Sequence, residues 1–207
     1  MNDTTQEKIL EVASKLFAEQ GLEGTSIREI AREAQVNLAA INYHFKSKEN
    51  LYMEVFARNY KWMEDGVTKI AQDKTLDTRE FCWQLYEFFV GNSDAMMNSF
   101  KILLNKNVDF SEAQKYCSGD GESFGPPGAI HMLEVIKRDV GENVSFEQCH
   151  WAMRMVFAVL VHFGVMMGTS FMKANCNKMP FMSPEQKKLD IYQLVESIIA
   201  NLKSKAK

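Results

Sequence analysis

The stretch TSIREIAREAQVNLAAINYHFKSKEN, residues 25–50, decides the fold of the N-terminal part of the chain. It predicts two short helices separated by a tight turn. Ser26 opens a capping-box pattern, which marks the start of a helix over residues 27–34. Asn37 can cap the next helix, over residues 38–45. Two helices joined by so short a turn are typical of a helix-turn-helix.

The second of these helices has two unlike sides. At 100° per residue, Leu38, Ile41 and Phe45 fall together and are expected to face inward. The opposite side is short and nearly uncharged, with Asn42 near the boundary, and it contains Ala39, Ala40, Tyr43 and His44. Lys46 and Lys48 flank this side, which suits entry into a major groove. A small helical protein can also contain this arrangement without touching DNA.

The rest of the chain predicts an all-α protein. Apolar residues recur at helical spacing, and a helix that ends at Gly21 precedes the quoted stretch. A longer helix begins after Ser47. Further helices are predicted over residues 78–91, 94–105, 128–139, 147–172 and 184–203. Residues 107–127, rich in Gly and Pro, are expected to form a loop.

Charge alone does not indicate a nucleic-acid-binding protein. The net charge is −3 over 207 residues, and residues 1–60 contain nine acidic and seven basic side chains. This balance excludes a protein that coats nucleic acid through general positive charge. Any DNA contact must therefore depend on where individual side chains lie.

The cysteines and the N-terminus favour a cytoplasmic protein. Four cysteines at irregular spacings, Cys82, Cys117, Cys149 and Cys176, predict reduced thiols and no metal site. The first residues lack the basic and apolar regions of a signal peptide. Residues 155–172 are long and apolar enough for a membrane span, but His162 interrupts them and no basic cluster flanks them. We expect a buried helix at a protein interface there.

Enzyme motifs are not found in the sequence. It has no Gly-rich phosphate loop, no G-x-S-x-G and no H-E-x-x-H, and its four histidines are scattered at positions 44, 131, 150 and 162. Cys149 and His150 are adjacent in sequence and would point to different faces of a helix. We expect no enzyme activity, no catalytic residues, no cofactor and no metal.

Residues 8–56, KILEVASKLFAEQGLEGTSIREIAREAQVNLAAINYHFKSKENLYMEVF, resemble the DNA-binding module of the TetR family. The resemblance implies a three-helix helix-turn-helix domain over residues 1–47 and a larger helical domain over residues 48–207 for ligand binding and dimerisation. It implies a sequence-specific transcriptional regulator, a repressor released from its DNA operator by a small apolar ligand. The alternative is a regulator whose C-terminal domain only dimerises or binds a protein partner.

The resemblance also assigns roles to single residues. Phosphate contacts fall to side chains at the helix ends, namely Ser26, Arg28, Tyr43, His44 and Lys48. Base-edge contacts fall to three residues at the start of the second helix, namely Asn37, Ala39 and Ala40. Asn42 stands where tyrosine is more usual and can contact a phosphate or an adenine. Gln35 stands where the turn often has glycine, so it is expected to adopt a left-handed conformation.

The two last long helices are expected to form a homodimer. Gly164 and Gly168 lie four residues apart, which indicates close approach of another helix. The helix over residues 184–203 has an apolar stripe of Ile191, Val195, Ile198 and Leu202. We expect the helices near 147–172 and 184–203 to build a four-helix interface with a partner copy. Alternatively, both stripes are ordinary core.

The predicted ligand pocket depends on large adaptable side chains in the C-terminal part. Thirteen methionines and fourteen phenylalanines are many for this length, and methionine adapts to varied ligands. The expected lining residues are Phe88, Met97, Phe100, Trp151, Met155, His162 and Met166. These stripes can also be core, and His162 can simply bond a neighbouring carbonyl.

Overall fold

A computed structural model describes residues 2–105, 108–111, 113 and 126–205. Within these residues the chain is helical and contains no strand, which confirms the predicted all-α class. Most of the predicted loop over residues 107–127 lies outside the described residues. The predicted helix over residues 78–91 is α5 (Thr78–Gly91), with both bounds as expected.

The chain divides into two compact units. The N-terminal unit comprises residues 1–62 and 98–125, and the C-terminal unit comprises residues 63–97 and 126–207. Both α4 (Lys48–Ala71) and α6 (Ser93–Leu103) contribute residues to each unit. The predicted division at residue 48 separates two functions rather than two sets of contacts, and it stays a prediction.

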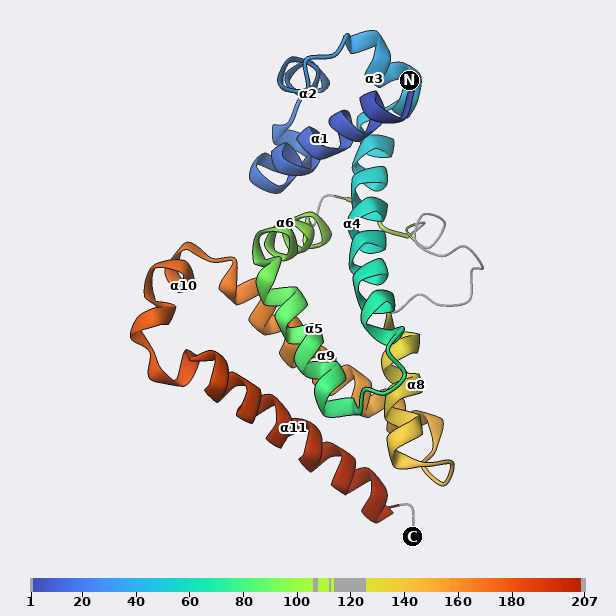
Figure 1. The fold of residues 1–207 in the computed structure, drawn as a ribbon. Coiled ribbons are helices and arrows are strands. Elements are labelled where there is room, and N and C mark those ends of the chain that lie inside the picture. The colour runs from blue at the N-terminus through green and yellow to red at the C-terminus, as the bar shows by residue number, and fades with distance from the viewer. Residues whose placement is uncertain (1, 106–107, 112, 114–125, 206–207) are drawn as a thin grey trace. The chain divides into compact units, whose positions relative to one another are not determined.

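The N-terminal unit contains the three helices that the sequence predicted. They are α1 (Asn2–Gly24), α2 (Ile27–Glu33) and α3 (Leu38–Phe45), and Figure 1 shows them grouped at the N-terminal end of α4. The regular geometry of α1 breaks at Gly21, whose φ of 73° is left-handed, so the expected stop is confirmed there. The Tyr52 hydroxyl donates to the Ile102 carbonyl at 2.8 Å, and both residues are buried in this unit's core.

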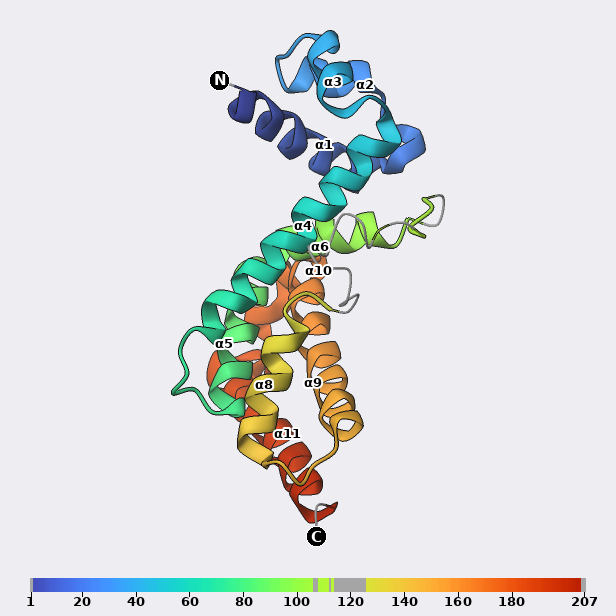
Figure 2. The ribbon, with the colours of Figure 1, turned by 90° about the vertical axis from the view of Figure 1, so that its right-hand side faces the viewer.

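The C-terminal unit is a layer of helices packed around α9 (Phe146–Met167). This helix contacts α5, α8 (Ala129–Val140) and α11 (Pro184–Lys205). Figure 2 shows α8 and α9 side by side. The short α10 (Ser170–Asn175) and two turns of 3₁₀-helix, η1 (Cys176–Lys178) and η2 (Pro180–Met182), connect α9 to α11.

The two glycines of the predicted interface do mark a close approach of helices, but within one chain. A Cβ at Gly164 would lie 2.9 Å from the Phe89 Cβ on α5. A Cβ at Gly168, just past the end of α9, would lie 2.4 Å from the carbonyl oxygen of Ser93 on α6. These glycines therefore let α5 and α6 pack against α9, and they do not face a partner copy.

The apolar stripe of α11 is core, which corrects the expected interface role. Ile191, Val195 and Leu202 are each about 1% exposed, and Ile198 is half-buried. They pack within the unit because α11 contacts α5, α8 and α9. The surface that covers the stripe belongs to the same chain.

One side of α9 remains exposed in the single chain. Trp151 is 41% exposed and Met155 is 42% exposed, and His162 and Met166 also lie on the exposed side. By length and composition α9 is long enough and apolar enough to cross a membrane, and a third of its most apolar window is buried. The core helix of a soluble protein has the same length and composition.

The described cysteines are free thiols, in line with the predicted absence of disulfides among them. They are Cys82, Cys149 and Cys176, whereas Cys117 lies outside the described residues. Burial raises the pKa of both Cys82 and Cys149, which keeps these thiols protonated and unreactive.

We predict that Gly164→Ala destabilises the C-terminal unit. The new methyl group would meet Phe89 and Met96, and overpacking of a dense core costs about 1–3 kcal/mol of unfolding free energy. Gly91→Ala is the matched control, because a Cβ there meets nothing within 4 Å. Replacing a helical glycine by alanine at an open position raises the free energy of unfolding by up to about 1 kcal/mol. Urea unfolding of both variants measures the two opposite effects, and equal effects would contradict this packing.

Candidate nucleic-acid interface

The angle between α2 and α3 is fixed by a small buried cluster. Ile30 in α2 and Ala34 at the C-terminal end of α2 are buried, as are Ile41 and Phe45 in α3. The turn between the helices places Gln35 at a φ of 55°, so the expected left-handed conformation is confirmed. A bond from the Val36 amide to the Ala31 carbonyl, 3.0 Å long, closes this turn. The outward side of α3 is therefore held in one orientation relative to α2.

The outward side of α3 differs in part from the predicted one. Ala39, Asn42 and Tyr43 are exposed, and Tyr43 is 76% exposed. Ala40 and His44 are only half-buried, so they lie at the edges of this side rather than in its centre.

Leu38 corrects the helical-wheel prediction. It was expected to face inward with Ile41 and Phe45, but 37% of it is exposed, against 1% and 3% for those two residues. Asn37 caps α3, so Leu38 is the first residue of the helix. At this end of the helix fewer neighbouring side chains cover it than cover Ile41 and Phe45. The position of the cap in the sequence was the signal that could have shown this.

Two predicted contact residues also cap helices. The Ser26 oxygen accepts from the Glu29 amide at 3.1 Å, and Asn37 Oδ1 accepts from the Ala39 amide at 2.9 Å. Capping uses acceptor atoms only. The Ser26 hydroxyl proton and the Asn37 amide NH₂ group are therefore left as donors that can reach a phosphate or a base.

Lys48 lies close to the start of α2. Its ammonium donates to the Thr25 carbonyl at 3.3 Å, beside Ser26. The Thr25 hydroxyl in turn donates to the Gly21 carbonyl at 2.8 Å, which ties the end of α1 to this point. This bond uses one of the three N–H donors of the Lys48 ammonium, so the other donors stay available. The ammonium therefore adds positive charge beside the N-terminus of α2. Arg28, on the first turn of α2, is exposed.

Several acidic side chains of this unit are paired with bases away from α3. Glu11 on α1 bonds Lys15 at 2.9 Å, and this hydrogen bond lowers the pKa of Glu11. Glu7 pairs with Arg58 at 3.2 Å. The outward side of α3 itself contains no acidic residue. The slight acidity of residues 1–60 therefore does not place negative charge on the outward side of α3.

The seven predicted ligand-lining residues are not brought together. Phe88 lies in a groove of about 530 Å³ within the C-terminal unit, formed by α4 and α5 and lined by Gly66, Lys69, Ile70, Glu80, Gln84, Glu87 and Phe88. A Cβ at Gly66 would lie 2.1 Å from the Phe88 ring, so the ring rests on the α4 backbone. Met97 packs near Gly168, and Phe100 is half-buried on the part of α6 that belongs to the N-terminal unit.

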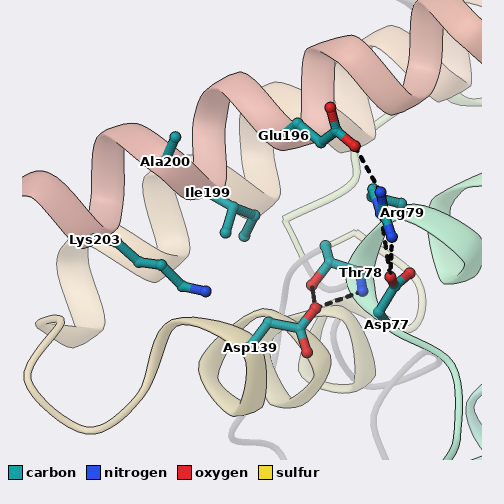
Figure 3. Close-up of a pocket in the computed structure, with 8 residues that line it drawn as sticks. All are labelled: Asp77, Thr78, Arg79, Asp139, Glu196, Ile199, Ala200 and Lys203. Carbon is teal, nitrogen blue, oxygen red and sulfur yellow. Dashed lines mark hydrogen bonds and ion pairs between the residues drawn. The ribbon is translucent and has the colours of Figure 1, made fainter.

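The other four predicted residues, Trp151, Met155, His162 and Met166, lie on the exposed side of α9 and line neither this groove nor the cleft of Figure 3. That cleft, formed by the start of α5 and by α8 and α11, is polar and internally paired. Arg79 bonds Asp77 at 2.9 Å and Glu196 at 2.6 Å, and Asp139 accepts from both the amide and the hydroxyl of Thr78 (Figure 3). It does not match a site for an apolar ligand.

These observations define the N-terminal unit as a helix-turn-helix of the DNA-binding class, with α3 as its reading helix. Residues 9–55 match the family described as bacterial regulatory proteins, tetR family. The match identifies residues 9–55 as a DNA-binding module of the TetR type.

The curated relatives are similar mainly over the N-terminal part. The probable HTH-type transcriptional regulator YttP of Bacillus subtilis is 40% identical over 79 residues, which cover 36% of this chain and 38% of the relative. The biofilm operon regulator IcaR of Staphylococcus aureus, a negative transcriptional regulator, is 26% identical over 107 residues, or 51% of this chain and 57% of IcaR. The chain thus matches less than two thirds of either relative's length.

Solved structures share the fold over nearly the whole chain. A putative transcriptional regulator from Pseudomonas aeruginosa superposes with a TM-score of 0.74 at 14% identity, covering 100% of this chain and 96% of that one. The regulator FadR from Bacillus subtilis, solved in complex with stearoyl-CoA, gives a TM-score of 0.59 at 16% identity, covering 96% and 97%. At these identities the likeness concerns the fold alone.

Proposed function

We propose that the chain is a sequence-specific repressor that binds an operator as a homodimer and is released by a small apolar ligand. The observation that carries the proposal is the outward side of α3, which is exposed, free of acidic residues and bordered by Lys48 and the start of α2. A rigid, uncharged helix side suits base edges, and the flanking donors suit phosphates. A regulator of this kind acts in the cytoplasm, where its operator lies.

Within this proposal the predicted contact residues keep their roles, except that Ala40 contributes less and Asn42 is assigned to a base. Ser26, Arg28, Tyr43, His44 and Lys48 contact phosphates, and Asn37 and Ala39 face base edges. Ala40 is half-buried and so reaches the bases less fully than Ala39. Asn42 is exposed on the same side as Ala39, which supports the adenine-reading role for its amide over the phosphate role.

The homodimer is supported by the exposed side of α9. Trp151, Met155 and Met166 together with His162 expose a continuous apolar strip at helical spacing, and solvent-exposed apolar strips of this kind favour a protein interface. A dimer also doubles the contacts that one eight-residue helix can make. The buried stripe of α11 does not contribute, so the proposed interface uses α9 and the outward side of α11.

The ligand part of the proposal depends on the groove at Phe88. Its volume, about 530 Å³, is in the range of small-molecule sites. Phe88 and Ile70 form the apolar part of a lining that also contains Lys69, Glu80 and Glu87. FadR, which has the same fold, was solved in complex with stearoyl-CoA, so long-chain acyl-CoA esters are the first compound class to test. The alternative, in which the C-terminal domain only dimerises or binds a protein, uses the same exposed side of α9 and needs no ligand, and the thermal-shift experiment below separates the two.

For DNA binding, we predict that selection from random DNA yields a palindromic sequence bound by the full chain. Lys48→Ala should weaken binding to all sequences and reduce the slope of log affinity against log salt by about one per half-site, because one phosphate contact is lost. Fluorescence anisotropy at several salt concentrations measures this slope. Lys203→Ala on α11 is the control and should leave it unchanged. A chain that selects no sequence at low salt refutes the proposed function.

For the dimer, we predict a mass of twice 23.7 kDa by light scattering coupled to chromatography at micromolar concentration. Met155→Glu should give the monomer, since two unpaired carboxylates would be buried across a two-fold interface. Ile130→Glu, at a more exposed apolar position on α8, should remain a dimer. A wild-type monomer, or dissociation of both variants, contradicts an interface on α9.

For the ligand, we predict that long-chain acyl-CoA or another apolar compound raises the melting temperature and lowers DNA affinity. A ligand at 100 times its Kd stabilises the folded state by about 2.7 kcal/mol. Phe88→Ala should reduce this shift, whereas Phe146→Ala, an exposed phenylalanine at the start of α9, should not. If no compound class shifts the melting temperature, the domain acts only in dimerisation or protein binding.

A further inference from the structure

Leu38 is an apolar side chain that packing covers only in part. It is the first residue of α3, directly after the Asn37 cap, and 37% of it is exposed. The two core residues of the same helix, Ile41 and Phe45, are almost fully buried. The exposed part of Leu38 therefore stays in water in the free protein.

Leu38 borders the outward side of α3 through Asn42. Asn42 lies four residues on and is exposed, so the exposed part of Leu38 adjoins it on the helix surface. The N-terminal residues of a reading helix are the ones that meet base edges in the major groove. Leu38 thus lies at the end of α3 that enters deepest.

The chemistry of leucine limits what it can recognise there. Its side chain neither donates nor accepts a hydrogen bond, so it cannot read the donors and acceptors of the bases. The one apolar group that a base presents in the major groove is the C5-methyl of thymine. We propose that Leu38 is a specificity-determining residue that reads a thymine methyl group in each half-site; this inference rests on the proposed function.

The size of the effect follows from the group that is read. Burying one methyl-sized group contributes enough for roughly a fourfold change in affinity. A dimer on a palindromic operator makes the contact twice, so replacing both thymines should lower affinity about fifteenfold if the half-sites act independently. Uracil is the direct probe, because it lacks the methyl group and keeps the hydrogen-bonding groups of thymine.

The experiment uses the full chain and an operator obtained by selection from random DNA. Uracil replaces each thymine in turn, and anisotropy gives the affinity of each duplex. The wild type should lose roughly fourfold at one thymine per half-site. Leu38→Ala should bind the thymine operator more weakly and show no further loss with uracil at that position. Leu38→Met keeps an apolar side chain and should retain the uracil effect.

Controls separate this inference from folding and from the proposed function. Ile130→Ala, an exposed aliphatic residue on α8, should leave both the affinity and the uracil effect unchanged. Melting temperatures of the Leu38 variants should lie well above the temperature of the binding measurement, which shows that each variant is folded. If a selected operator shows no uracil effect, or the effect persists in Leu38→Ala, the role of Leu38 is refuted while the proposed function stands. If no operator can be selected, both fall.

Discussion

The burial of Ile41 and Phe45 on one side of α3 is the interaction on which the N-terminal unit depends. An eight-residue helix is too short to be stable alone, because nucleation is costly and few hydrogen bonds follow it. Burying a large apolar side chain contributes roughly 1.5–3 kcal/mol, so two such residues supply most of what holds α3 in place. The same packing determines which residues face outward, and hence what the helix can contact.

The C-terminal unit is organised by a comparable constraint at its glycines. Gly164 and Gly168 have no Cβ, which lets α5 and α6 approach α9 at distances that any side chain would prevent. One side of α9 is thereby occupied within the chain, and its opposite side is left exposed with Trp151 and Met155. The exposed side that supports the proposed dimer is thus a consequence of the tight packing on the other side.

Local signals predicted local structure well. Ser26 and Asn37 cap the helices that the sequence placed after them, and Gln35 has the left-handed φ expected from its position in the turn. These features depend on a few neighbouring residues and on backbone chemistry. The bounds of α5 were predicted for the same reason, since Asp77 caps its first turn and a glycine ends it.

What the sequence could not predict is which surface covers an apolar stripe. Periodicity shows that Val195 and Met155 each lie on an apolar side of a helix, yet the first is core and the second is exposed. The difference depends on which helices pack against α11 and α9 in the folded chain. The local sequence pattern does not show those neighbours. The seven predicted ligand-lining residues come from helices with different tertiary neighbours. Among the described residues, Phe88 lies in the groove between α4 and α5, where its ring rests on Gly66.

The burial of Leu38 depends on two things, its angle around the axis of α3 and its position along that axis. A helical wheel sorts residues by angle alone and places Leu38 with the core, but burial also depends on the position along the helix axis. At the first residue of α3 the module covers that angle only in part, so 37% of Leu38 is exposed. An uncharged reading surface gains little affinity from electrostatics, and sequence discrimination must then come from close apolar and hydrogen-bonded contacts with bases. An exposed leucine at the tip of the reading helix is the kind of contact that such a surface needs.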